Sequence, residues 1–71
     1  MNPSQFQQFC LAQAQWWIAS AVTGHAKQRK LQKMNENREW VDLTDEEKIA
    51  DAMNIAQNHL NNFRESCEGL L

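Results

Sequence analysis

A long stretch without charge is the strongest constraint on how this chain folds. Residues 2–24 contain no Asp, Glu, Lys or Arg, and Gly24 is the first glycine. Pro3 suits the first turn of a helix, and nothing between Pro3 and Gly24 breaks one. A single glycine inside a helix costs only about 1 kcal/mol relative to alanine, so we expect a helix over about residues 3–35, straight or slightly bent. A break at Gly24 is the alternative.

The remaining composition also favours helices. The chain of 71 residues has two glycines, one proline and no tyrosine, whereas alanine, glutamine, asparagine and leucine are frequent. A chain this short buries only about 60% of its unfolded surface, which leaves room for one domain with a marginal core. We therefore expect a single all-α domain.

A second helix has a clear start signal. Thr44 and Glu47 have the spacing of a capping box, in which the hydroxyl accepts from the N3 amide and the carboxylate reaches back to the cap. The three acidic residues of this first turn also suit the positive end of the helix dipole. We expect this helix over about residues 45–68, with Gly69 near its end.

Residues 36–43 are expected to connect the two helices without regular structure. Asn35 and Asn37 are typical of a connection, and we interpret Trp40 and Val41 as apolar anchors rather than as a strand. Two long helices joined by one short connection predict an antiparallel helical hairpin.

The two expected helices differ in how much of their surface is apolar. In the second helix the apolar residues alternate at spacings of four and three and form one stripe about 100° wide. These positions are Ile49, Met53, Ala56, Leu60, Phe63, Cys67 and Leu70. In the first helix the apolar residues span roughly 240°, so one neighbouring helix cannot cover them.

Part of the first helix therefore needs a further partner, since uncovered apolar patches on monomers mark interaction sites. The expected partner or oligomer interface consists of Leu11, Trp16, Trp17, Ile18 and Val22. The simplest cover is a second copy, because most oligomers are symmetric and small domains often complete their core this way. We expect homo-oligomerisation. A three-helix monomer, in which residues 25–35 fold back over the patch, is the alternative.

Residues 25–33 form the one basic cluster of the chain. Its possible phosphate contacts are Lys27, Arg29, Lys30 and Lys33. Cations near the end of the first helix also complement its dipole, and an antiparallel hairpin would bring them beside Asp45, Glu46, Glu47 and Asp51. We favour this structural interpretation over phosphate binding.

No pattern in the sequence predicts catalysis, a cofactor or a metal site. A nucleophile with its base, a carboxylate pair and a glycine-rich phosphate loop are all missing. Cys10 and Cys67 lack the CxxC spacing of redox and zinc sites, so we expect reduced thiols. His25 and His59 are expected at the surface. We expect a protein that is not an enzyme.

The apolar stretch is shorter than the roughly 20 residues of a membrane span, and residues 1–8 lack the basic start of a secretory signal. We therefore expect a cytoplasmic protein. The expected function is a helical protein-interaction module that binds a protein partner, itself or both, and phage and mobile-element regulators or inhibitors of host proteins fit this profile. The alternative is a nucleotide- or nucleic-acid-binding protein that uses residues 25–33.

Overall fold

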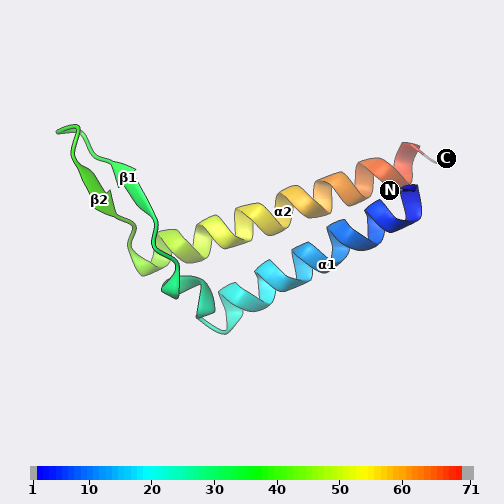
Figure 1. Cartoon of the computed structure of the whole chain (residues 1–71), viewed down its shortest axis with the longest axis horizontal. Coiled ribbons are helices and arrows are strands. Elements are labelled where there is room, and N and C mark those ends of the chain that lie inside the picture. The colour runs from blue at the N-terminus through cyan, green and yellow to red at the C-terminus, as the bar shows by residue number, and fades with distance from the viewer. Residues whose placement is uncertain (1, 70–71) are drawn as a thin grey trace.

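Two antiparallel helices make up most of the computed structural model, which describes residues 2–69 (Figure 1). In chain order the elements are α1 (Pro3–Val22), a 3-10 turn η1 (His25–Gln28), β1 (Gln32–Met34), β2 (Trp40–Asp42) and α2 (Asp45–Gly69). The helices lie side by side, and the β-hairpin projects from the end of the pair where α1 ends and α2 begins (Figure 1). The expected helical hairpin is confirmed, and a small sheet is added to it.

The sheet corrects the expectation of an all-α domain. β1 and β2 pair antiparallel, with Met34 opposite Trp40 and Lys33 opposite Val41. Trp40 and Val41 are therefore strand residues, although the sequence interpretation placed them in an irregular connection. Aromatic and β-branched residues favour strands, so the local signal was present but too short to decide the structure.

The turn of the hairpin is organised by Asn35. Its side-chain oxygen accepts hydrogen bonds from the backbone amides of Asn37 and Glu39, both at 2.9 Å. The Asn35 amide in turn donates to the Glu39 carbonyl at 2.9 Å. Arg38 completes the turn with φ 62°, in the left-handed region that non-glycine residues seldom occupy. Asn35 thus closes the hairpin with a side chain suited to local turn bonds.

The first helix ends at Val22, which corrects the expected helix over residues 3–35. Gly24 adopts φ 80°, the left-handed conformation that commonly follows the last turn of a helix. The Gly24 amide donates to the Ala21 carbonyl, and η1 begins immediately afterwards. The energetic cost of glycine inside a helix was small, but the reversal of the chain buries Ala26 completely. Burial in tertiary structure therefore decided where α1 ends.

Both long helices begin with reciprocal capping bonds. The Asn2 side chain accepts from the Gln5 amide at 2.8 Å, and the Gln5 side chain accepts from the Asn2 amide at 3.2 Å. The predicted capping box of α2 is confirmed, because Thr44 and Glu47 exchange the corresponding bonds at 3.1 and 3.2 Å. A cap of this kind contributes about 1 kcal/mol to helix stability.

The core between the helices is made of small side chains. The buried apolar residues are Cys10, Ala14, Ala21, Ala26, Ala52 and Ala56, and the largest side chain among those almost completely buried is Cys10. Trp17 and Ile49 pack at the margin of the cluster formed by Ala21, Ala26 and Ala52. Side chains of this size let the two helix backbones approach closely, as small residues do at other helix contacts.

The stripe predicted on α2 is rotated in the structure. Met53, expected to face α1, is 45% exposed, whereas its neighbour Ala52 is completely buried. Ala56 is buried as expected, Leu60 and Phe63 are half-buried, and Leu70 lies outside the described residues. The sequence interpretation favoured large apolar residues at the contact, but the helices meet through alanines.

We predict that Ala52→Leu destabilises the fold by about 1 to 3 kcal/mol, because the added carbon atoms of leucine cannot fit between closely packed helices. Ala50→Leu is the matched control, since Ala50 is exposed on the same helix and surface substitutions change stability by less than about 0.5 kcal/mol. Urea unfolding followed by circular dichroism measures both. Equal effects of the two substitutions would contradict the alanine contact.

Candidate functional site

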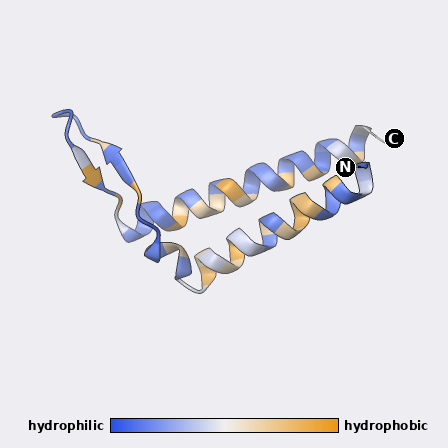
Figure 2. Ribbon diagram, in the orientation of Figure 1, coloured by the Kyte–Doolittle hydropathy of each residue, from blue (hydrophilic) through white to orange (hydrophobic). Residues whose placement is uncertain are grey.

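Within residues 2–69 the fold fully buries only small apolar side chains, and every large one is half-buried or exposed. Among the described residues, the exposed ones are Phe6, Phe9, Leu11, Trp16, Val22, Met34, Trp40 and Met53. Five of these eight belong to α1, and Figure 2 shows that α1 is coloured more toward hydrophobic than the largely hydrophilic α2. Exposed apolar side chains that gather on one face of an element are candidate sites of protein interaction.

The structure separates the residues that we expected to form one interface. Val22 is 79% exposed, Trp16 is 56% exposed, and Leu11 is also exposed. Ile18 and Trp17 are half-buried. On the helix wheel Leu11, Ile18 and Val22 lie on one side of α1, whereas Trp16 lies more than a quarter turn away. The expected set is therefore distributed over two sides of the helix.

Trp17 belongs to the packing within the chain. It contacts the cluster of Ala21, Ala26 and Ala52. The Arg29 guanidinium lies 4.6 Å from the centre of the Trp17 ring, and the Trp16 ring meets the Trp17 ring edge-on at 4.9 Å. A continuous first helix would have carried Arg29 away from Trp17, so the break after Val22 is what makes this contact.

The basic cluster pairs with the start of α2, as the preferred interpretation predicted, but it does not complement the dipole of α1, because α1 ends at Val22 with no basic residue in its last turn. Arg29 Nη1 lies 2.8 Å from Asp51 Oδ2, and the Lys33 ammonium donates to the Glu47 carboxylate. Lys48 Nζ donates to the Lys27 carbonyl oxygen at 3.1 Å. Exposed ion pairs contribute about 0 to 1 kcal/mol each, so these bonds orient the hairpin more than they stabilise the fold.

The four possible phosphate contacts therefore differ in their surroundings. Arg29 and Lys33 have carboxylate partners within the chain, whereas Lys27 and Lys30 are exposed. A hollow of about 470 Å³ lies between the hairpin and the first turn of α2, lined by Lys30, Leu31, Gln32, Asp42 and Lys48. Its two lysines share it with an aspartate, so its charge is mixed.

Lys33 has a defined effect on Glu47. Its hydrogen bond lowers the pKa of the Glu47 carboxyl below the ordinary 4.5, and the backbone amide of Thr44 lowers it further. The folded protein therefore binds the Glu47 proton less tightly than the unfolded chain does. The ionised Glu47 carboxylate therefore stabilises the fold at a pH above its pKa in the unfolded chain. This contribution is lost as the pH falls through the pKa of Glu47 in the folded protein.

We predict that Lys33→Met makes the fold less sensitive to acid, because the substitution removes the largest cause of the lowered pKa of Glu47. The measurement is the urea midpoint at about pH 7 and about pH 3, and the difference should be smaller in the variant than in the wild type. Lys30→Met, at an exposed lysine of the same segment, is the control. A variant that loses as much stability in acid as the wild type would disprove the coupling.

We predict no appreciable binding of the wild type to a double-stranded oligonucleotide at about 150 mM salt, because two of the four cations already have carboxylate partners. Fluorescence anisotropy measures this directly. Micromolar affinity that falls steeply with salt and is lost in Arg29→Glu/Lys30→Glu would instead support the nucleic-acid alternative.

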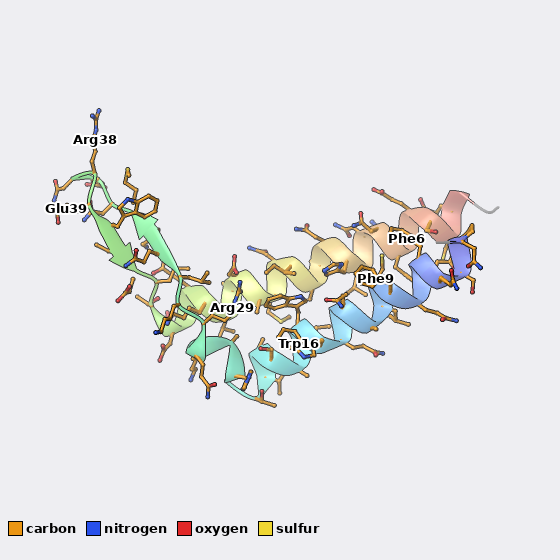
Figure 3. The ribbon with its side chains drawn as sticks, in the orientation of Figure 1. Phe6, Phe9, Trp16, Arg29, Arg38 and Glu39 are labelled. Atoms are coloured by element: carbon orange, nitrogen blue, oxygen red, sulfur yellow. The ribbon has the colours of Figure 1, made fainter. Side chains whose placement is uncertain are left out.

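The β-hairpin presents an apolar pair that the sequence interpretation did not select. Met34 and Trp40 face each other across the two strands, and Trp40 is 65% exposed. Arg38 lies at the tip of the hairpin, as Figure 3 shows. The sequence signal for this hairpin was the alternation of apolar and polar residues on both sides of a turn that contains Asn35 and Asn37. An isolated two-stranded hairpin is marginal in water, so the ion pair between Lys33 of β1 and Glu47 of α2 helps to hold this pair in place.

The cysteines and histidines within residues 2–69 form neither a disulfide nor a metal site. Cys10 is buried and Cys67 half-buried, and both are free thiols. The His59 ring meets the Phe9 ring edge-on at 6.2 Å, whereas His25 is exposed in η1. No group of three or more His, Cys, Asp or Glu side chains in this range is placed to hold a metal ion.

No helix in the described part of the chain combines the length and the apolar character needed to cross a membrane. Comparison of the chain with protein-family models, with characterised proteins and with solved structures gives no match. The arguments about function therefore come from the chain's own residues.

Proposed function

We propose that this protein is a small interaction module, which binds another protein through apolar side chains that its own fold leaves exposed. One observation supports the proposal above all. Among the residues that the structure describes, the largest side chain that the fold buries almost completely is Cys10, while Trp16, Trp40 and Phe9 are all exposed. Aromatic side chains contribute much of the binding energy of protein interfaces, so exposing them without a partner is costly.

Two exposed regions are suited to a protein partner. One is the side of α1 that carries the exposed Leu11 and Val22 and the half-buried Ile18 at helical spacing. The other is the Met34 and Trp40 pair on the hairpin, where tryptophan is the residue most enriched at binding hot spots. The hairpin projects beyond the helices, which makes the pair accessible from outside (Figure 1).

A regulatory or inhibitory role follows as part of this proposal. Exposed apolar side chains supply binding energy but no acid, base or nucleophile, so the effect of the protein would come from occupying a surface of its partner. The two intrachain ion pairs of the basic segment favour this reading over phosphate binding.

We predict that a photoreactive phenylalanine derivative at Trp40 or at Val22 forms cross-links to a protein in the cells that naturally express this chain. Both side chains are largely exposed, so the substitution leaves the core unchanged. Mass spectrometry of the cross-linked species identifies the partner. The reason for the expected cross-link is the exposed apolar area at each position.

Asn58 is the control position for this experiment, because it is an exposed polar residue on α2. It should give no specific cross-link. The proposal fails if neither apolar position captures a protein, or if Asn58 captures the same proteins with equal yield.

A further inference from the structure

A second face of α1 has a pattern that is complementary to itself. Its six positions alternate at spacings of four and three, so they share one side of the helix. They are Gln5, Phe9, Ala12, Trp16, Ala19 and Thr23, and all six are exposed. We call this set the α1 outer face. In order along the helix its side chains are polar, large, small, large, small and polar.

When two copies of the α1 outer face run in opposite directions, each large side chain of one copy lies opposite a small side chain of the other. If a second helix of the same sequence runs antiparallel about a two-fold axis level with Ala14, the position numbers of facing residues add to 28. Phe9 then faces Ala19 of the partner subunit, and Trp16 faces Ala12 of the partner subunit. The two polar ends also face each other. Large side chains entering spaces beside small ones is how packed helices interdigitate.

We infer that two copies of this chain form an antiparallel dimer through the α1 outer face, with Phe9 and Trp16 of each copy packed over Ala19 and Ala12 of the other. This inference rests on the proposed function, since it names a second copy of the chain as one protein partner. It also gives the interface a register. Figure 3 shows Phe9 and Trp16 spaced along α1.

A hollow in the surface lies where the register needs one. It has a volume of about 200 Å³ and is lined by Trp16, Ala19, Ser20, Thr23 and His25. A cavity of about 150 Å³ is enough to hold a benzene ring. In the dimer the Phe9 ring of the second copy is level with Ala19 and enters this hollow. Phe9 is 46% exposed in the single chain, so it is available for the contact.

The charge pattern favours a copy of the same chain over a charged partner. A two-fold interface brings each patch against itself, so charged residues in it meet like charges near the axis. The α1 outer face has no charged residue, and residues 2–24 as a whole have none. The uncharged helix can therefore pack on itself without electrostatic repulsion.

The surface area that the single chain exposes in excess of an ordinary monomer is close to the area that a dimer interface buries. A folded monomer of 8.3 kDa has an accessible surface of about 4,600 Å². This chain exposes 5481 Å², which is about 900 Å² more. A standard interface removes about 800 Å² from each partner. One dimer contact along α1 would bring the exposed area close to that of an ordinary small protein.

The test is sedimentation equilibrium of the full chain at micromolar concentration, with substitutions that exchange large and small residues. The wild type should be a dimer. Ala12→Trp places two tryptophans opposite each other, and Trp16→Ala leaves a void, so each should weaken dimerisation by at least about tenfold. In the double variant Ala12→Trp/Trp16→Ala the large and small residues face each other again, and dimerisation should recover.

Ala50→Trp is the matched control, because it adds the same side chain at an exposed alanine of α2 and should leave the dimer unchanged. Circular dichroism of every variant checks that the helices are retained. A wild type that stays monomeric overturns the inference, and so does a dimer that Ala12→Trp leaves intact. A double variant that stays as weak as the single ones overturns the register and with it the proposed face.

Failure of this inference is distinguishable from failure of the proposed function. A monomeric chain that still cross-links a different protein through Val22 or Trp40 overturns the dimer and leaves the interaction module in place. A monomeric chain that captures no protein from either position overturns both.

Discussion

Contact through alanines is the constraint on which the rest of this structure depends. Ala14 and Ala21 of α1 meet a face of α2 that carries Ala52 and Ala56, and all four are buried. Small side chains allow close approach of the helices but remove little apolar area from water, and the hydrophobic contribution is proportional to that area. The fold therefore has a thin core, and four of its aromatic side chains, Phe6, Phe9, Trp16 and Trp40, remain exposed, where a partner can reach them.

A second set of contacts fixes the hairpin relative to the helices. The reversal at Gly24 carries Arg29 back over Trp17 and into contact with Asp51, while Lys33 reaches Glu47. Each contact is weak by itself, since surface ion pairs and exposed cation–π contacts contribute about 1 kcal/mol or less. Together they span the junction of α1, the hairpin and α2. The single chain thus presents the hairpin pair and the two sides of α1 in defined directions.

Local signals were sufficient where one short segment decides the outcome. The capping box at Thr44 and Glu47, the start of the first helix at Pro3 and the antiparallel arrangement of the two helices (Figure 1) could all be predicted from the sequence. The pairing of the basic segment with the acidic start of α2 was also predictable, because opposite charges lie near each other in a hairpin. Of the expected interface, Val22 and Trp16 are exposed, whereas Trp17 packs within the chain.

What the sequence by itself determined is the helical pair, its caps and the uncharged character of α1, because these depend on spacing and residue type within single helices. Tertiary structure decided three other features: the end of α1 at Val22, the strands at Gln32–Met34 and Trp40–Asp42, and the alanine face of α2. The physical reason is that each competes with an alternative of nearly equal local free energy. A glycine or a short strand can take either conformation, and a helix can rotate, until burial against a neighbouring element selects one.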